Sequence, residues 1–156
     1  MSGSRAASQG AVDRAELREL FDRYVVALDT VAERGLDDGW FRTVFTEDVE
    51  LTFPIGSHRG VAGFAAFQRT ARTWWRTTHH VSGPHVVKVE GDEARLRVHQ
   101  LATHVHLDAA AGLFEVGGHY EAHALRTADG WRLDRIAFHV DWTRGRRLEA
   151  FADAPF

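Results

Sequence analysis

The sequence predicts one α+β domain in which a curved, cone-shaped antiparallel sheet wraps over about three N-terminal helices and leaves an interior cavity. Two observations lead to this prediction. Apolar residues recur every three or four positions in the first half of the chain, and from Thr77 onward they alternate with polar ones. Helices followed by a long run of strands are typical of an α+β fold with the helices on one face of the sheet.

The strongest helical pattern begins near Asp13, where Asp13 and Glu16 form an Asp-x-x-Glu capping pattern. Gly35 is expected to end this helix after Arg34. Residues 1–12 are mostly small and polar and lack the apolar core of a secretion signal, so we expect them to form a disordered tail. The apolar residues that recur at helical spacing are Leu17, Leu20, Phe21, Tyr24, Val25 and Leu28.

Shorter elements follow before the period changes. Asp37 or Asp38 can cap a second helix that runs to Phe45. We then expect a turn at 47–48, a strand at 49–53, a loop at 56–60 and a third helix at 61–75.

The second half predicts a meander of long strands. Gly91-Asp92 forms a tight turn, and Gly117-Gly118 indicates a bulge inside a strand. The strands are expected at 77–90 with a bend at Pro84, at 94–107, at 113–126 and at 131–142. The domain would therefore span residues 13–143, followed by a C-terminal tail at 144–156.

Composition excludes several classes of function. The chain has no cysteine, which rules out disulfides, thiolate nucleophiles and iron–sulfur clusters. The net charge of −3 and the scattered Lys and Arg residues do not indicate a nucleic-acid or membrane partner. No apolar run approaches the roughly 20 residues that cross a bilayer. We expect a cytoplasmic protein.

Histidines are concentrated in one short stretch of the chain. Of the ten histidines, six lie between His79 and His106. On the strand expected at 94–107, Gln100, His104 and His106 share one face with small and apolar residues. A face that mixes small, apolar and titratable side chains is typical of a cavity wall.

The order of these motifs resembles the SnoaL-like families, which belong to a superfamily that includes nuclear transport factor 2, ketosteroid isomerase and scytalone dehydratase. The resemblance rests on Tyr24–Asp29, on Phe45–Leu51, on Gly60 before a helix, and on His79-His80 at the start of the meander. It covers about residues 15–142 and implies the cone-shaped fold.

Scytalone dehydratase shares the most motifs. Its Asp at the end of the first helix matches Asp29, its first meander His matches His80, and its His-Gln-Leu strand ends in a His that matches His104. The resemblance implies that Asp29 and His80 form a base dyad and that His104 is the acid partner. A carboxylate bonded to one ring nitrogen of a histidine makes the other nitrogen a better base. No cofactor is needed.

The sequence also departs from that family. The two substrate-facing tyrosines of scytalone dehydratase fall at Leu28 and Phe53, so scytalone itself is not the expected substrate. Bile-acid dehydratase has a Tyr five residues before its Asp, and Tyr24 is accordingly a candidate oxyanion donor. We expect dehydration of a small hydrophobic, polyketide- or terpenoid-like carbonyl compound, as in secondary metabolism. The expected substrate-binding residues are Phe53, Phe64, Trp74, Gln100, Phe138 and Trp142.

Other functions stay open. Polyketide cyclisation of the SnoaL type and ketosteroid-isomerase-like isomerisation need the same base, acid and dry cavity. A non-catalytic scaffold subunit, like those of ring-hydroxylating dioxygenases, would have a filled cavity and its histidines outside. A metal site of His104 and His106 with His80 or His85 is a further alternative.

We also expect an oligomer. His99, His119 and His123 fall on the outer face of the sheet, where a second subunit of a homodimer or homotrimer would pack.

Overall fold

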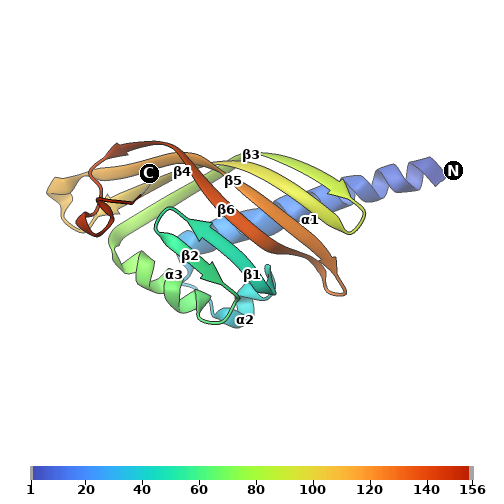
Figure 1. Ribbon diagram of the computed structural model, residues 1–156, viewed down its shortest axis with the longest axis horizontal. Coiled ribbons are helices and arrows are strands. Elements are labelled where there is room, and N and C mark those ends of the chain that lie inside the picture. The colour runs from blue at the N-terminus through green and yellow to red at the C-terminus, as the bar shows by residue number, and fades with distance from the viewer. Residues whose placement is uncertain (1, 155–156) are drawn as a thin grey trace.

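The computed structural model describes residues 2–154, with side chains from residue 7 onward, and has a mixed α+β fold (Figure 1). Two single-turn 3₁₀ segments, η1 and η2, accompany the regular elements. The elements are α1 (Ser2–Thr30), α2 (Asp38–Phe41), β1 (Phe45–Phe53), β2 (Gly56–Arg59), α3 (Phe64–Thr73), β3 (Trp75–Glu90), β4 (Glu93–His106), η1 (Ala109–Ala111), β5 (Leu113–Thr127), β6 (Gly130–Gly145) and η2 (Glu149–Phe151).

The strands form one curved six-stranded sheet in the order β2-β1-β6-β5-β4-β3. The expected α+β class and curved sheet are confirmed, but the sheet is not antiparallel throughout, because β1 pairs in parallel with β6. The register places Leu51 beside Ile136. No tight turn joins β1 to β6, so chain connectivity does not impose the antiparallel direction that hairpins impose on the other pairs.

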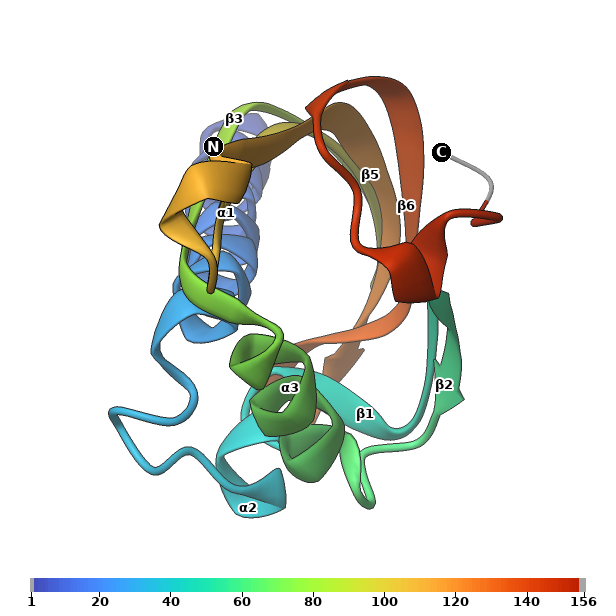
Figure 2. The same ribbon diagram turned by 90° about the vertical axis from the view of Figure 1, so that its left-hand side faces the viewer.

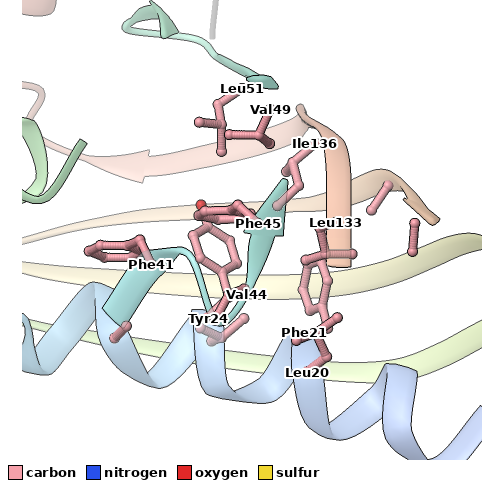
Figure 3. Close-up of a cluster of buried hydrophobic side chains, with 14 of the residues drawn as sticks. Leu20, Phe21, Tyr24, Phe41, Val44, Phe45, Val49, Leu51, Leu133 and Ile136 are labelled. Atoms are coloured by element: carbon pink, nitrogen blue, oxygen red, sulfur yellow. The ribbon is translucent and has the colours of Figure 1, made fainter. Parts of the chain in front are cut away.

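Helix α1 packs on the inner face of the sheet, mainly against β3 and also against β6 (Figures 1 and 2). Its apolar side projects Phe21 and Tyr24 toward Phe45 of β1 and Leu133 of β6 (Figure 3). These four side chains are almost fully buried. The helical spacing of the apolar residues in the sequence therefore corresponds to the face that forms the core.

The first helix differs from its prediction at the N-terminal end. It begins at Ser2 rather than near Asp13, so residues 2–12 are helical instead of a disordered tail; Met1 lies outside the described residues. The Ala, Arg and Gln residues of this segment favour the helical state. Asp13 is consequently not a cap. Its carboxylate accepts two hydrogen bonds of 2.9 Å from Arg126 and one from Trp131.

The segment between the helices also differs from its prediction. The expected turn at 47–48 lies inside β1, and the expected loop at 56–60 forms strand β2, which pairs with β1. The turn and the loop were both predicted wrongly for the same reason. These segments are held as strands by pairing with neighbours in the sheet, which their own sequence periodicity does not reveal. Helix α3 is shorter than expected and ends at Thr73.

The strand register agrees with the expected alternation. On β4, Val98, Gln100 and Ala102 are buried, whereas His99 and Leu101 are exposed. The outer face carries paired histidines. His119 stacks on His139 with 5.1 Å between ring centroids, and His123 Nδ1 lies 2.6 Å from Asp134 Oδ1. Packing of a second subunit against this face stays a prediction. Among the described residues, none of the helices combines the length and apolar character needed to cross a membrane.

The predicted bulge is present, since the β5–β6 register shifts between Gly117 and Gly118. We expect Gly118→Ala to lower the free energy of unfolding by about 1–3 kcal/mol in urea denaturation. A Cβ at Gly118 would lie 2.1 Å from the backbone oxygen of His139, and backbone cannot easily retreat. Gly117→Ala is the matched control. Its Cβ would meet the Trp142 ring, which is half exposed and can swing away. Equal stability of the two variants would contradict this account.

Candidate active site

A cavity of about 160 Å³ opens between the inner face of the sheet and helix α3. The C-terminal segment that carries η2 contributes three residues to its lining. Of the residues predicted from the sequence, the lining includes His80, His104, Phe53, Trp74, Gln100 and Phe138. Leu28, which matches a substrate-facing tyrosine of scytalone dehydratase, also lines it. The expected interior cavity is therefore present and most of its predicted wall is correct.

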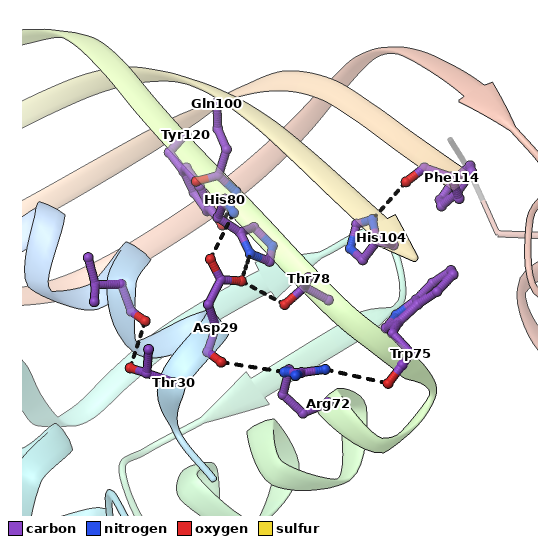
Figure 4. Close-up of polar contacts among 11 residues, drawn as sticks. Asp29, Thr30, Arg72, Trp75, Thr78, His80, Gln100, His104, Phe114 and Tyr120 are labelled. Carbon is purple, nitrogen blue, oxygen red and sulfur yellow. Dashed lines mark hydrogen bonds and ion pairs between the residues drawn. The ribbon is translucent and has the colours of Figure 1, made fainter. Parts of the chain in front are cut away.

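The predicted dyad forms at one side of this cavity. His80 Nδ1 lies 2.6 Å from Asp29 Oδ1, and the backbone N–H of His80 donates to Oδ2 at 2.8 Å (Figure 4). The Thr78 hydroxyl donates to Oδ1 at 2.6 Å. Asp29 stands at the end of α1, while Thr78 and His80 are two residues apart on β3 and so share its inner face. His79, between them, is exposed.

These contacts determine the charge on Asp29. Burial by itself would raise the pKa of its carboxyl, but the hydrogen bonds and charge of His80 and the hydroxyl of Thr78 outweigh it, and the pKa lies below its usual value. Asp29 is therefore an anion near neutral pH and an acceptor for three donors. A carboxylate in this position accepts the Nδ1 proton of His80 and leaves the Nε2 lone pair free.

His104 is the second titratable group of the cavity. Its ring lies 5.6 Å from the ring of His80 and 4.6 Å from that of Trp75. Burial, followed by the nearby His80, lowers the pKa of His104 from 6.5 to about 4. Its Nδ1 lies 3.1 Å from the backbone oxygen of Phe114 and donates to it. Near neutral pH this ring is therefore neutral, and its one proton is already donated to a carbonyl. This arrangement does not favour the expected acid role, which stays a prediction.

Tyr24 does not reach the cavity. It is fully buried in the core beside Phe21 and Phe45. Burial, and then the neighbouring Tyr120, raises the pKa of Tyr24 well above its usual value. A different tyrosine, Tyr120 on β5, lines the cavity. Its hydroxyl accepts a hydrogen bond of 3.3 Å from the side-chain amide of Gln100. Burial raises the pKa of Tyr120 to about 12, so it stays protonated.

Two predicted substrate-binding residues lie elsewhere. Phe64 is completely buried among Phe41, Phe45 and Phe67. Trp142 lies on the outer face, half exposed, next to Gly117. Both were assigned by aromatic character, which does not distinguish the core and the outer surface from a cavity wall.

The alternative metal site is not assembled. His106 Nε2 donates to the backbone oxygen of Arg146 at 2.6 Å, and His104 Nδ1 is bonded to a carbonyl. His85 pairs with Asp22 at 2.9 Å. Neither His85 nor His106 lines the cavity.

The sequence reading missed several wall residues. Thr78 is detectable two positions before His80, and Arg72 lies four and eight residues after Gln68 and Phe64, at helical spacing. The C-terminal segment was expected to be a tail outside the domain. Instead Phe151 packs on Trp74 with 4.9 Å between ring centroids, and Arg147 and Leu148 line the cavity.

Solved structures share this architecture. Kfla4162 from Kribbella flavida is 28% identical, with a TM-score of 0.76 over 86% of this chain and 95% of that one. A candidate scytalone dehydratase from Novosphingobium aromaticivorans is 18% identical, with a TM-score of 0.71 over 96% and 94% of the two chains. The hexachlorocyclohexane dehydrochlorinase LinA-type3 from Novosphingobium barchaimii is 15% identical, with a TM-score of 0.72 over 94% of each chain. At these last two identities the likeness shows the fold alone.

The search of curated proteins gave no match. The profile of the SnoaL-like domain matches residues 9–137, which is most of the chain and includes Asp29, His80 and His104. With the six-stranded curved sheet and the helices on its inner face, this match shows that the chain belongs to the SnoaL-like family.

Proposed function

We propose that this protein is a cofactor-independent dehydratase of a small hydrophobic carbonyl compound. One observation carries the proposal, namely the Asp29–His80 pair at 2.6 Å beside an apolar cavity that His80 lines. Membership of a family that resembles dehydratases, cyclases and isomerases supports it. An open cavity with the dyad at its wall favours an enzyme over a scaffold subunit, for which a filled cavity is expected.

His80 would act as the base. Because its Nδ1 proton is held by Asp29, the Nε2 lone pair is the available acceptor. In the elimination, the proton on the carbon next to the carbonyl passes to Nε2, and the electrons of that C–H bond form the carbon–carbon double bond. The C–O bond at the next carbon breaks, and the departing hydroxide takes the proton back from His80 to leave as water.

Two neighbours would assist this sequence. The neutral ring of His104 can accept a hydrogen bond from the substrate hydroxyl through Nε2 and hold it on the same side as His80. Tyr120, which stays protonated, can donate to the oxygen of the developing enolate. Tyr120 thus takes the donor role that the sequence suggested for Tyr24.

The test is a panel of β-hydroxy ketones and β-hydroxy thioesters with apolar groups, followed by ultraviolet absorption of the conjugated product and by mass spectrometry. A dehydratase removes one water from the substrate, whereas an isomerase leaves the mass unchanged. We expect His80→Gln to lower turnover by about 100- to 10,000-fold. His79→Gln, one residue away on the opposite face of β3, is the matched control and should keep its activity. A parent protein inactive on the whole panel, or equal rates in both variants, would favour the scaffold function.

A further inference from the structure

Two arginines, Arg72 and Arg147, line the cavity. Among the residues that the structure describes, no aspartate or glutamate belongs to this lining. The Asp29 carboxylate lies behind Thr78 and His80, which occupy its oxygens. In a partly buried site, a positively charged side chain such as Arg72 favours an anionic ligand.

Arg72 stands in the last turn of α3, partly buried. Its Nε points to the backbone oxygen of Asp29 and its Nη1 to that of Trp75, both at a long 3.5 Å (Figure 4). A guanidinium has five N–H donors, and these two weak contacts leave most of its capacity unused. Among the side chains that the structure describes, no carboxylate oxygen lies within 4.0 Å of Arg72.

Several other arginines of this protein pair with a carboxylate, which Arg72 does not. The arginines that pair with a carboxylate include Arg42 with Glu47, Arg97 with Glu121, Arg126 with Asp13 and Arg144 with Glu115. Arg72, in contrast, bears its charge at a cavity wall with backbone oxygens as its partners. A cation so placed costs desolvation on folding unless an anion joins it.

We propose that the substrate carries a carboxylate, which Arg72 binds at the end of the cavity next to the dyad. The planar fork of a guanidinium matches the two oxygens of a carboxylate. Because Arg72 contacts the backbone of Asp29, whose side chain holds His80, the carboxylate subsite and the base have a fixed relative position. Phe53 and Phe138 then contact the apolar body of the ligand.

This placement restricts the chemistry of the substrate. A carboxylate makes the proton on its neighbouring carbon hard to remove, because a second negative charge would develop beside it. The carbonyl that activates the proton is therefore a separate ketone or thioester, and the carboxylate serves for binding. This last step rests on the proposed dehydratase function, whereas the binding of the carboxylate does not.

The test compares two flat aromatic probes of nearly equal shape, 2-naphthoate and neutral 2-naphthamide, by isothermal titration calorimetry at pH 7. The parent protein should bind the carboxylate about tenfold more tightly, since a charge-assisted pair contributes roughly 1.5 kcal/mol. Arg72→Gln should remove that preference. Arg69→Gln is the matched control from the same helix, because Arg69 donates to the Leu36 backbone oxygen and does not line the cavity.

Each other outcome overturns the proposal. Equal affinities for the two probes, no binding of either, or a preference that survives in Arg72→Gln would do so. A preference lost only in Arg147→Gln would also overturn it, because the subsite would then belong to Arg147. Circular dichroism and a melting curve check the fold, and Arg72→Lys serves as the second variant if Arg72→Gln unfolds. In His80→Gln the preference should persist. If the dehydratase proposal is wrong, the protein will turn over no compound of the panel but will still prefer 2-naphthoate to 2-naphthamide.

Discussion

Replacing Asp29 by Asn is expected to reduce turnover by about 100- to 10,000-fold while the fold stays intact. The carboxylate accepts three hydrogen bonds, from Thr78, from the backbone N–H of His80 and from His80 Nδ1. An amide has a single acceptor oxygen, and the fixed backbone N–H takes it. The amide N–H₂ then faces Nδ1, so the ring proton moves to Nε2 and the lone pair no longer faces the substrate.

Two measurements check this expectation. The rate on any substrate found in the panel gives the loss of turnover, and long-range proton–nitrogen NMR gives the tautomer of His80 without a substrate. Asp22→Asn is the matched control, because Asp22 lies on the same helix and pairs with His85 of the same strand outside the cavity. A dyad without catalytic importance would show the same small rate change in both variants.

Replacing Asp13 by Asn should destabilise the protein by about 2–3 kcal/mol at pH 7. This is less than the roughly 3–5 kcal/mol for breaking a fully buried ion pair, because the Arg126 side chain is 31% exposed. The side chain of Asp13 is 4% exposed, and it joins α1 to Arg126 and Trp131 at the β5–β6 hairpin. Asp92→Asn is the matched control. Asp92 is the other carboxylate that pairs with Arg126, and its side chain is 83% exposed. Its replacement should lower the free energy of unfolding by only about 0–1 kcal/mol.

The same pair predicts a pH dependence. The hydrogen bonds from Arg126, against the opposing effect of burial, lower the pKa of Asp13 from 3.8 to about 2. A carboxyl whose pKa is lower in the folded state contributes stability above its unfolded pKa and loses it as the pH falls. Urea denaturation should therefore show the difference between the parent and Asp13→Asn at pH 7 and little of it near pH 2. A difference independent of pH would mean that packing, and not charge, explains the effect.

Much of the fold was determined by local pattern. The helical spacing around Phe21 and Tyr24 identified the buried face of α1, and the alternation along β4 placed Gln100 and His104 on one inner face. The family resemblance added Asp29 and His80, which the structure brings to 2.6 Å. Periodicity suffices for these features because a side chain's direction relative to its own backbone depends only on the local element.

Tertiary structure decided what local pattern leaves open. Asp13 looked like a helix cap, but its partner Arg126 is 113 residues away along the chain. Tyr24 and Phe64 carry the right chemistry for a cavity wall and yet lie in the core, whereas Tyr120 and Arg72 reach the cavity. The neutral state of His104 likewise arises from burial and from His80 on another strand. Desolvation and pairing depend on which elements meet, and this is determined by the packed domain as a whole rather than by any one segment.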